Sequence, residues 1–147
     1  MTARRRSPQD VGDELWDLIG NFGGEGMPRE IALDKMTESQ FEIAKAWDRD
    51  NRCIAEHECL VYLYSLYMRT KDPRLALLAV VRELALMRKR AVRLHRSAIA
   101  PLDPADRQSP QIIVASQAVD GILRSTKRMS DAGFSVDLAL RGEGPPE

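Results

Sequence analysis

The stretch from Asp72 to Ala98 has the strongest helical periodicity in the chain. Its apolar residues recur at alternating steps of three and four, at Leu77, Val80, Leu84, Met87, Ala91, Leu94 and Ala98. This spacing lines one side of a helix, so it predicts a long helix that packs against other helices. Asp72 followed by Pro73 is typical of a helix start, and we expect the helix to begin there.

The opposite side of the same helix is basic. At about 100° per residue, four cations project away from the apolar side: Arg82, Lys89, Arg93 and Arg96. The whole chain has no net charge, but the segment 10–58 is rich in acidic residues and the segment 69–107 is rich in basic ones. This division fits pairing within one subunit, pairing between subunits, nucleic-acid binding by the basic half, or two solvated faces of opposite charge.

Further helix signals flank this stretch. Ser7 with Pro8 predicts a helix over 8–21, and the capping box Thr37-Glu38-Ser39-Gln40 predicts another helix start. From there a helical spacing continues to about Thr70, as one helix or two, and its apolar run 59–68 is expected to be enclosed on every side. Ser109 with Pro110 begins a second long helix, with a packed side at Ile112, Ala115, Val119, Ile122, Thr126 and Met129.

These signals predict an all-α fold, a helical bundle with a long antiparallel helical hairpin. We divide the chain into an N-terminal arm and helical region (1–50), a helical core and oligomerisation region (51–133) and a C-terminal tail (134–147). The two periodic helices and the run 59–68 offer more apolar surface than one small bundle needs, so we expect an oligomer. Leu63 and Tyr67 are the predicted interface residues.

Several classes of function lack a signal in the sequence. Cys53 and Cys59 form no disulfide framework, no leader is evident, and the longest apolar run is too short to span a bilayer, so a cytoplasmic protein is expected. Cys53 and His57 could share a helical face, but Cys59 would point elsewhere, so we expect no metal. The glycine-rich segment 20–28 lacks the Lys-Ser/Thr pair of a phosphate loop. No nucleophile or cofactor motif occurs, and we expect neither enzymatic activity nor a cofactor.

One short region resembles a known family. The segment 106–111 (DRQSPQ), the later Leu123-Arg124 and the ending 129–134 (MSDAGF) are similar to the C-terminal portion of small terminase subunits from short-tailed bacteriophages. The resemblance covers about 30 residues, because its motifs are confined to this last helix. It implies a non-enzymatic protein whose helical subunits form rings, bind the packaging site on viral double-stranded DNA and recruit a large ATPase-nuclease subunit. Such proteins often carry a helix-turn-helix near the N-terminus, whereas the acidic segment 10–58 shows no clear recognition helix.

DNA contact is therefore expected elsewhere, at an N-terminal arm and at the basic helix side: Arg4, Arg5, Arg6, Arg82, Lys89, Arg93 and Arg96. The leading hypothesis is a DNA-packaging adaptor whose acidic and basic halves meet head to tail between subunits. The alternative is a small helical protein-protein interaction module, such as a phage or plasmid regulator or inhibitor. An enzyme built from distant carboxylates is the third class.

Overall fold

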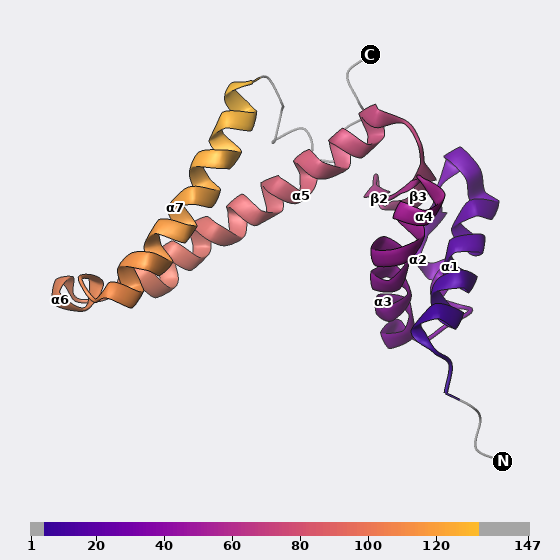
Figure 1. Cartoon of the computed structure of the whole chain (residues 1–147), viewed down its shortest axis with the longest axis horizontal. Helices are drawn as coiled ribbons and strands as arrows, with labels where there is room; N and C mark the ends of the chain where they lie inside the picture. The colour runs from indigo at the N-terminus through magenta and orange to yellow at the C-terminus, as the bar shows by residue number, and fades with distance from the viewer. Residues whose placement is uncertain (1–4, 133–147) are drawn as a thin grey trace. The chain divides into compact units, whose positions relative to one another are not determined.

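The computed structural model describes residues 5–132, which form helices and one small sheet (Figure 1). The elements are α1 (Pro8–Phe22), η1 (Gly23–Glu25), β1 (Met27–Pro28), α2 (Arg29–Leu33), α3 (Glu38–Trp47), η2 (Asp48–Arg52), α4 (Cys53–Glu56), β2 (Cys59–Leu63), β3 (Leu66–Thr70), α5 (Pro73–Leu94), η3 (His95–Ile99), α6 (Pro104–Arg107) and α7 (Pro110–Asp131). Contacts divide the chain after Ala79 into an N-terminal unit and a C-terminal unit. Among the described helices, none is long and apolar enough to cross a membrane. The predicted tail 134–147 lies outside the described residues.

In the N-terminal unit, both predicted helix starts are confirmed. The Ser7 hydroxyl accepts a hydrogen bond from the Asp10 amide at 3.1 Å, and the Asp10 carboxylate accepts one from the Ser7 amide at 3.0 Å. Thr37 and Gln40 make the same reciprocal pair at the start of α3. Each pair satisfies amides that have no partner inside the helix, which fixes where the helix begins.

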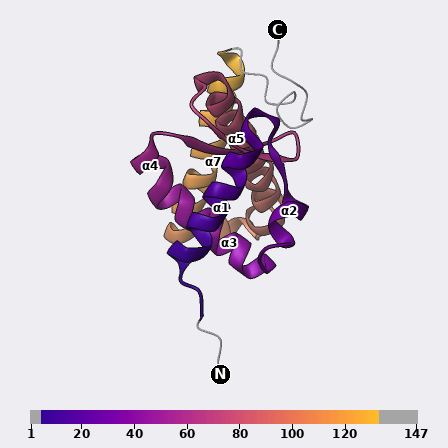
Figure 2. The same cartoon turned by 90° about the vertical axis from the view of Figure 1, so that its right-hand side faces the viewer.

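The N-terminal core lies where α1 packs on α3 (Figure 2). Trp16, predicted to be in the core, is 1% exposed. It is joined by other apolar side chains from α1, β1, α2 and α3: Val11, Leu15, Ile19, Met27, Ala32, Phe41 and Ala44. Burial of this apolar surface is the main force that holds the short elements of the unit together.

The prediction of helix through 38–70 is wrong beyond Glu56, and with it the strictly all-α fold. Cys59–Leu63 and Leu66–Thr70 form a β-hairpin, β1 pairs antiparallel with β3, and the sheet order is β1-β3-β2. The preceding helix ends because His57 adopts a left-handed conformation with φ of 53°. The segment that follows contains three tyrosines and Val61, and aromatic and β-branched side chains favour strands. The fold is therefore mostly helical with a small antiparallel sheet.

Leu63 and Tyr67, the predicted interface residues, are buried by their own chain. Leu63 is 3% exposed and clusters with Val61 and Met68 against the start of α5. Tyr67 is 6% exposed, and its ring meets that of Phe41 edge to face at 5.3 Å between centroids. Neither side chain belongs to the exposed surface of the described chain.

In the C-terminal unit, α5 and α7 pack antiparallel, which confirms the predicted hairpin (Figure 1). The Ser109 hydroxyl accepts a hydrogen bond from the Ile112 amide at 3.4 Å, so α7 begins where the sequence predicted. Val119 and Thr126, both on the predicted packed side of α7, are buried. α7 ends at Asp131, and the predicted terminal Gly133 lies outside the described residues.

The predicted packed side of α5 is only partly correct: Ala91 is buried against Val119 of α7, and Leu84 is half-buried. Four of its apolar side chains are 43–52% exposed: Leu77, Val80, Met87 and Leu94. Val81 and Ala85 are buried instead. The buried strip also contains Arg88, whose guanidinium donates to the Leu123 carbonyl at 2.9 Å and to the Thr126 hydroxyl at 3.1 Å. Because the buried strip contains Arg88, it is less apolar in sequence than the predicted strip beside it.

Candidate nucleic-acid interface

The four predicted cations lie on one side of α5 and of the π-helical turn η3 that continues it, which contains Arg96. Arg82, Lys89 and Arg96 follow one another at steps of seven residues, which return to nearly the same direction, and Arg93 lies beside them. Lys89, Arg93 and Arg96 are exposed, while Arg82 is half-buried and 4.0 Å from the Glu83 carboxylate. The row extends for about 21 Å along the helix axis. It is therefore long enough to follow several phosphates of a nucleic acid.

α7 extends this positive surface. Each helix of the pair has a line of residues that faces the other helix. In an antiparallel pair, side chains that are rotated in the same direction away from this line, as seen along each chain, point to the same side of the pair. Arg124 and Lys127 are displaced as the α5 cations are, and both are exposed, while the exposed Asp120 and Asp131 point to the same side. We call this surface the basic side of the hairpin: Arg82, Lys89, Arg93, Arg96, Arg124 and Lys127. Sequence reasoning missed the two α7 members because their placement depends on how the helices pair.

The predicted arginine arm is only partly described. Arg4 lies outside the described residues, while Arg5 and Arg6 precede α1 and are exposed. The Arg6 guanidinium pairs with the Glu14 carboxylate of α1. This ion pair neutralises part of the arm's charge, so the arm offers less to a phosphate than the sequence suggested.

The N-terminal unit contains a helix pair that the sequence did not reveal. α2 and α3 are joined by the short turn 34–37, and a β-hairpin follows. This is the connectivity of a helix-turn-helix, in which the second helix is the one that enters the major groove of DNA. α2 is so short that hydrophobic periodicity cannot detect it. The capping box at Thr37 was the one signal, and it located only the second helix.

The charges on α3 do not favour phosphate. Glu38, Glu42 and Asp50 are exposed on α3 and η2. Lys45 pairs with Glu42 at 2.8 Å and lies 4.6 Å from the Phe41 ring centroid, so its ammonium is already engaged. Arg29 at the start of α2 similarly pairs with Glu38 at 2.7 Å. The helix pair has the connectivity of a DNA reader, but Arg29 and Lys45 are paired and the exposed carboxylates would repel a phosphate backbone.

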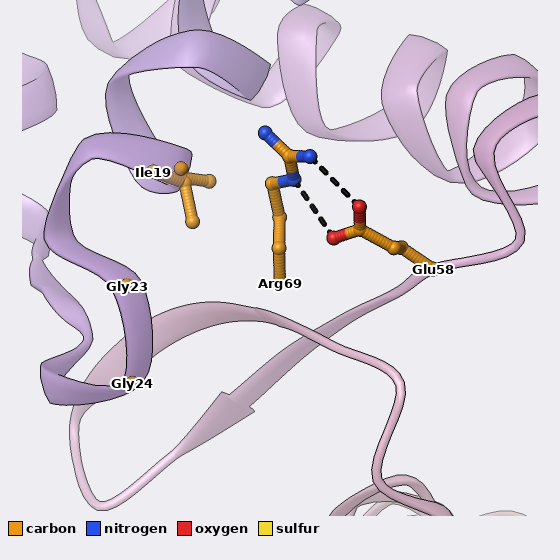
Figure 3. Close-up of a pocket in the computed structure, with 6 residues that line it drawn as sticks. Ile19, Gly23, Gly24, Glu58 and Arg69 are labelled. Atoms are coloured by element: carbon orange, nitrogen blue, oxygen red, sulfur yellow. Dashed lines mark hydrogen bonds and ion pairs between the residues drawn. The ribbon is translucent and has the colours of Figure 1, made fainter.

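A cleft of about 250 Å³ lies between the end of α1 and strand β3, as Figure 3 shows. On one wall, the Arg69 guanidinium donates two hydrogen bonds to the Glu58 carboxylate, at 2.9 and 3.1 Å, and a third to the Trp16 carbonyl at 3.2 Å. These bonds hold the pKa of Glu58 below its usual value. The opposite wall is formed by Gly23 and Gly24. Because each of its three nitrogens donates a hydrogen bond within the unit, Arg69 links the sheet to α1 and to Glu58.

A buried carboxylate lies at the junction of α3 and α4. Asp48 is 0% exposed, and neither of its oxygens has a hydrogen-bond partner among the described residues. It begins the π-helical turn η2, which widens the helix at this point. Burial raises the pKa of Asp48 to about 7, Arg52 opposes this rise, and Asp13 adds to it. The sequence DRDN of segment 48–51 indicated a polar break, so it gave no signal of burial.

The histidine and cysteine residues form no cluster. Cys53 is half-buried and Cys59 exposed, and both are free thiols. Within residues 5–132, no group of three or more histidine, cysteine or acidic side chains is placed to hold a metal ion.

Comparison with known proteins finds no protein-family model, curated protein or solved structure that matches this chain. What can be proposed of its function therefore depends on the geometry above and on the short resemblance in residues 106–134.

Proposed function

We propose that this protein is a non-enzymatic adaptor that self-associates and binds double-stranded DNA, in the manner of small terminase subunits. The observation that carries the proposal is the basic side of the hairpin. Six cations point to one side there, together with Asp120 and Asp131. A row of this length can contact several phosphates of duplex DNA, whereas a compact ligand would contact only part of it.

The hairpin would contact the DNA backbone rather than its bases. Arginine and lysine side chains on a two-helix surface reach phosphates, whereas base reading needs an element inserted into a groove. Affinity should therefore fall steeply with salt and vary little with DNA sequence. The helix-turn-helix connectivity of the N-terminal unit adds support, since the resembled family often carries such a unit near its N-terminus. The recruitment of a large ATPase-nuclease subunit is proposed from the resemblance alone.

A protein-protein interaction module, such as a phage or plasmid regulator or inhibitor, is the second candidate. One observation favours it: Ile43 on α3 is 40% exposed and Ile54 on α4 is 76% exposed, with carboxylates nearby. Exposed apolar side chains among acidic ones are typical of a surface for a basic protein partner rather than for DNA.

Fluorescence anisotropy with labelled duplexes tests the proposal. A double variant carrying Arg93→Glu and Arg96→Glu should bind at least about tenfold more weakly, because two attractive phosphate contacts become repulsive. A form lacking residues 2–6 should lose less affinity, since Arg6 is already paired with Glu14. The matched control carries Lys35→Glu and Arg49→Glu in the N-terminal unit, and it should bind within about threefold of wild type.

Every variant must first be shown to assemble as the wild type does. If both hairpin arginines can be reversed without loss of affinity, the basic side is not the DNA site. If the control pair weakens binding instead, the site lies in the N-terminal unit.

A further inference from the structure

One side of α5 is apolar and uncovered by the rest of the described chain. Val80, Met87 and Leu94 recur at steps of seven residues and are 51%, 44% and 52% exposed. They lie two residues from Arg82, Lys89 and Arg96, a rotation of about 200°, so they point away from the basic side. The contacts with α7 come from the strip between, where Arg88 donates to the Leu123 carbonyl and Ala91 is buried against Val119. α5 thus separates an apolar surface from a basic one.

α7 continues this apolar surface. Several of its residues are displaced from the contact line in the same rotational sense as Val80 and Met87, and so they point to the same side of the antiparallel pair. Val114 is 65% exposed, Ala115 and Ala118 are exposed, and Ile122 and Met129 are half-buried. We call this surface the apolar side of the hairpin: Val80, Leu84, Met87, Leu94, Val114, Ala115, Ala118, Ile122 and Met129.

No charged residue is a member of the apolar side. From Val80 onward, the charged side chains of both helices project toward the basic side or the outer edges of the pair, except for Arg88 between the helices and for Glu83, which lies at the margin of the apolar side within one turn of Val80 and Met87. A surface of this kind pairs favourably only with another that is also apolar and uncharged, because a charged partner would lose its hydration without gaining a counter-charge.

We propose that the apolar side is covered by the apolar side of a second copy of this chain, so that two hairpins form a four-helix bundle. The surface is complementary to itself, as a two-fold contact requires. The other large apolar side chains exposed in the described chain are scattered: Ile43, Ile54, Leu77 and Ile113. None of them forms a second apolar area of matching extent.

The area is sufficient for a stable pair. α7 has 22 residues, so it is about 33 Å long, and two adjacent helices are about 20 Å wide. The apolar side then measures up to roughly 650 Å² per copy, and two copies would together bury up to about 1,300 Å². Stable biological interfaces generally exceed about 1,000 Å² in total.

This inference rests on the proposed function, which includes self-association. It adds the surface through which two copies meet and the two-fold symmetry of their contact. It replaces the head-to-tail contact of acidic and basic halves that the sequence suggested. The contact is apolar, so added salt should leave it unchanged or strengthen it. Both basic sides then face outward, so assembly and DNA binding use different residues. Larger assemblies would be built from such pairs.

Sedimentation velocity of the full chain over a range of concentrations tests the pairing. The wild type should reach the mass of two chains or an even multiple of it, at low and high salt alike. Met87→Glu should weaken this association at least about a hundredfold, because the new carboxylate would be buried without a partner. Arg128→Glu is the matched control, since it places the same side chain on the exposed outer edge of α7, opposite the buried Val119, and it should associate within about threefold of wild type.

A second measurement keeps the test decisive if Met87→Glu folds poorly. Because association adds stability by mass action, the melting temperature of the wild type should rise with protein concentration, and that of Leu94→Glu should not. The proposal is overturned if the wild type stays monomeric. It is also overturned if added salt weakens the association and the Met87→Glu variant associates as strongly as wild type. A monomeric wild type whose form lacking 133–147 does pair would assign the surface to the chain's own C-terminal segment. DNA binding by the Arg93→Glu/Arg96→Glu variant is measured separately. The proposal for the basic side and the proposal for the apolar side can therefore fail independently.

Discussion

Asp48 shows how a single buried group can make the N-terminal unit sensitive to pH. Its carboxyl is surrounded by Arg52 of η2, Asp13 and Asp17 of α1 and Arg69 of β3, yet no hydrogen bond to either oxygen is formed among the described residues. Arg52 itself is 3.8 Å from Asp13 and 3.7 Å from Glu56, so its charge is shared among carboxylates. The net effect of this environment is to favour the neutral form of Asp48.

The unit should therefore lose stability as pH rises. The pKa of Asp48 is about 7 in the folded chain and near 3.8 in the unfolded one. Because the folded state binds the extra proton, the stability it confers is present below pH 4 and is lost as pH rises through 7. Asp48→Asn keeps the shape of the side chain without its charge. Its free energy of unfolding in urea should therefore increase relative to that of wild type as pH rises from 5 to about 8. Asp50→Asn, on the exposed side of η2, should track wild type, and parallel curves for Asp48→Asn and wild type would contradict the assignment.

At the residue scale, a feature could be predicted when the residues that produce it are close together in sequence. The caps at Ser7, Thr37 and Ser109 were predicted correctly because each involves a side chain and an amide three residues apart. The burial of Asp48 and the link made by Arg69 depend on contacts with α1, far away in sequence. No local pattern contains that information, so sequence reasoning missed both.

At the scale of elements, two helical glycines make a matched pair. A Cβ added to Gly12 of α1 would lie 2.7 Å from the Trp47 ring and 2.9 Å from an Asp48 oxygen. One added to Gly121 of α7 would meet nothing within 4 Å. Gly12→Ala should destabilise the protein by about 1–3 kcal/mol through overpacking, whereas Gly121→Ala should stabilise it by up to about 1 kcal/mol through helix propensity.

Denaturant unfolding of both variants checks this contrast, with wild type as the reference. A Gly12→Ala variant as stable as wild type would mean that α1 and α3 are not in the close contact described. The pair is informative because the chemical change is the same at both sites.

The β-hairpin shows why some elements escaped prediction. Its turn residues Tyr64 and Ser65 both have positive φ, 55° and 62°, as a two-residue type I′ turn requires. That turn is usually marked by asparagine or glycine, and neither is present here. The apolar segment 59–68 therefore seemed an uninterrupted helix. On α5, two neighbouring apolar strips differ by one residue, and only the position of α7 decides which of them is buried.

At the scale of the whole molecule, the hairpin has two sides with different chemistry. The sequence predicted the hairpin and the cations of α5, because helical period and charge are local. It could not predict that α7 adds Arg124 and Lys127 to one side and Ile122 and Met129 to the other, since this depends on how the two helices pair. In the proposed function, separation of the two sides would let one chain both assemble and hold DNA.

The most direct test of this account is the salt dependence of DNA binding, measured for wild type and for the Arg93→Glu/Arg96→Glu variant in their assembled form. Each phosphate contact contributes about 0.9 to the slope of log affinity against log salt concentration. We expect a steep slope for wild type and a slope smaller by about 1.8 or more for the variant, with unchanged assembly. Equal slopes for the two proteins would contradict the assignment of DNA binding to the basic side of the hairpin.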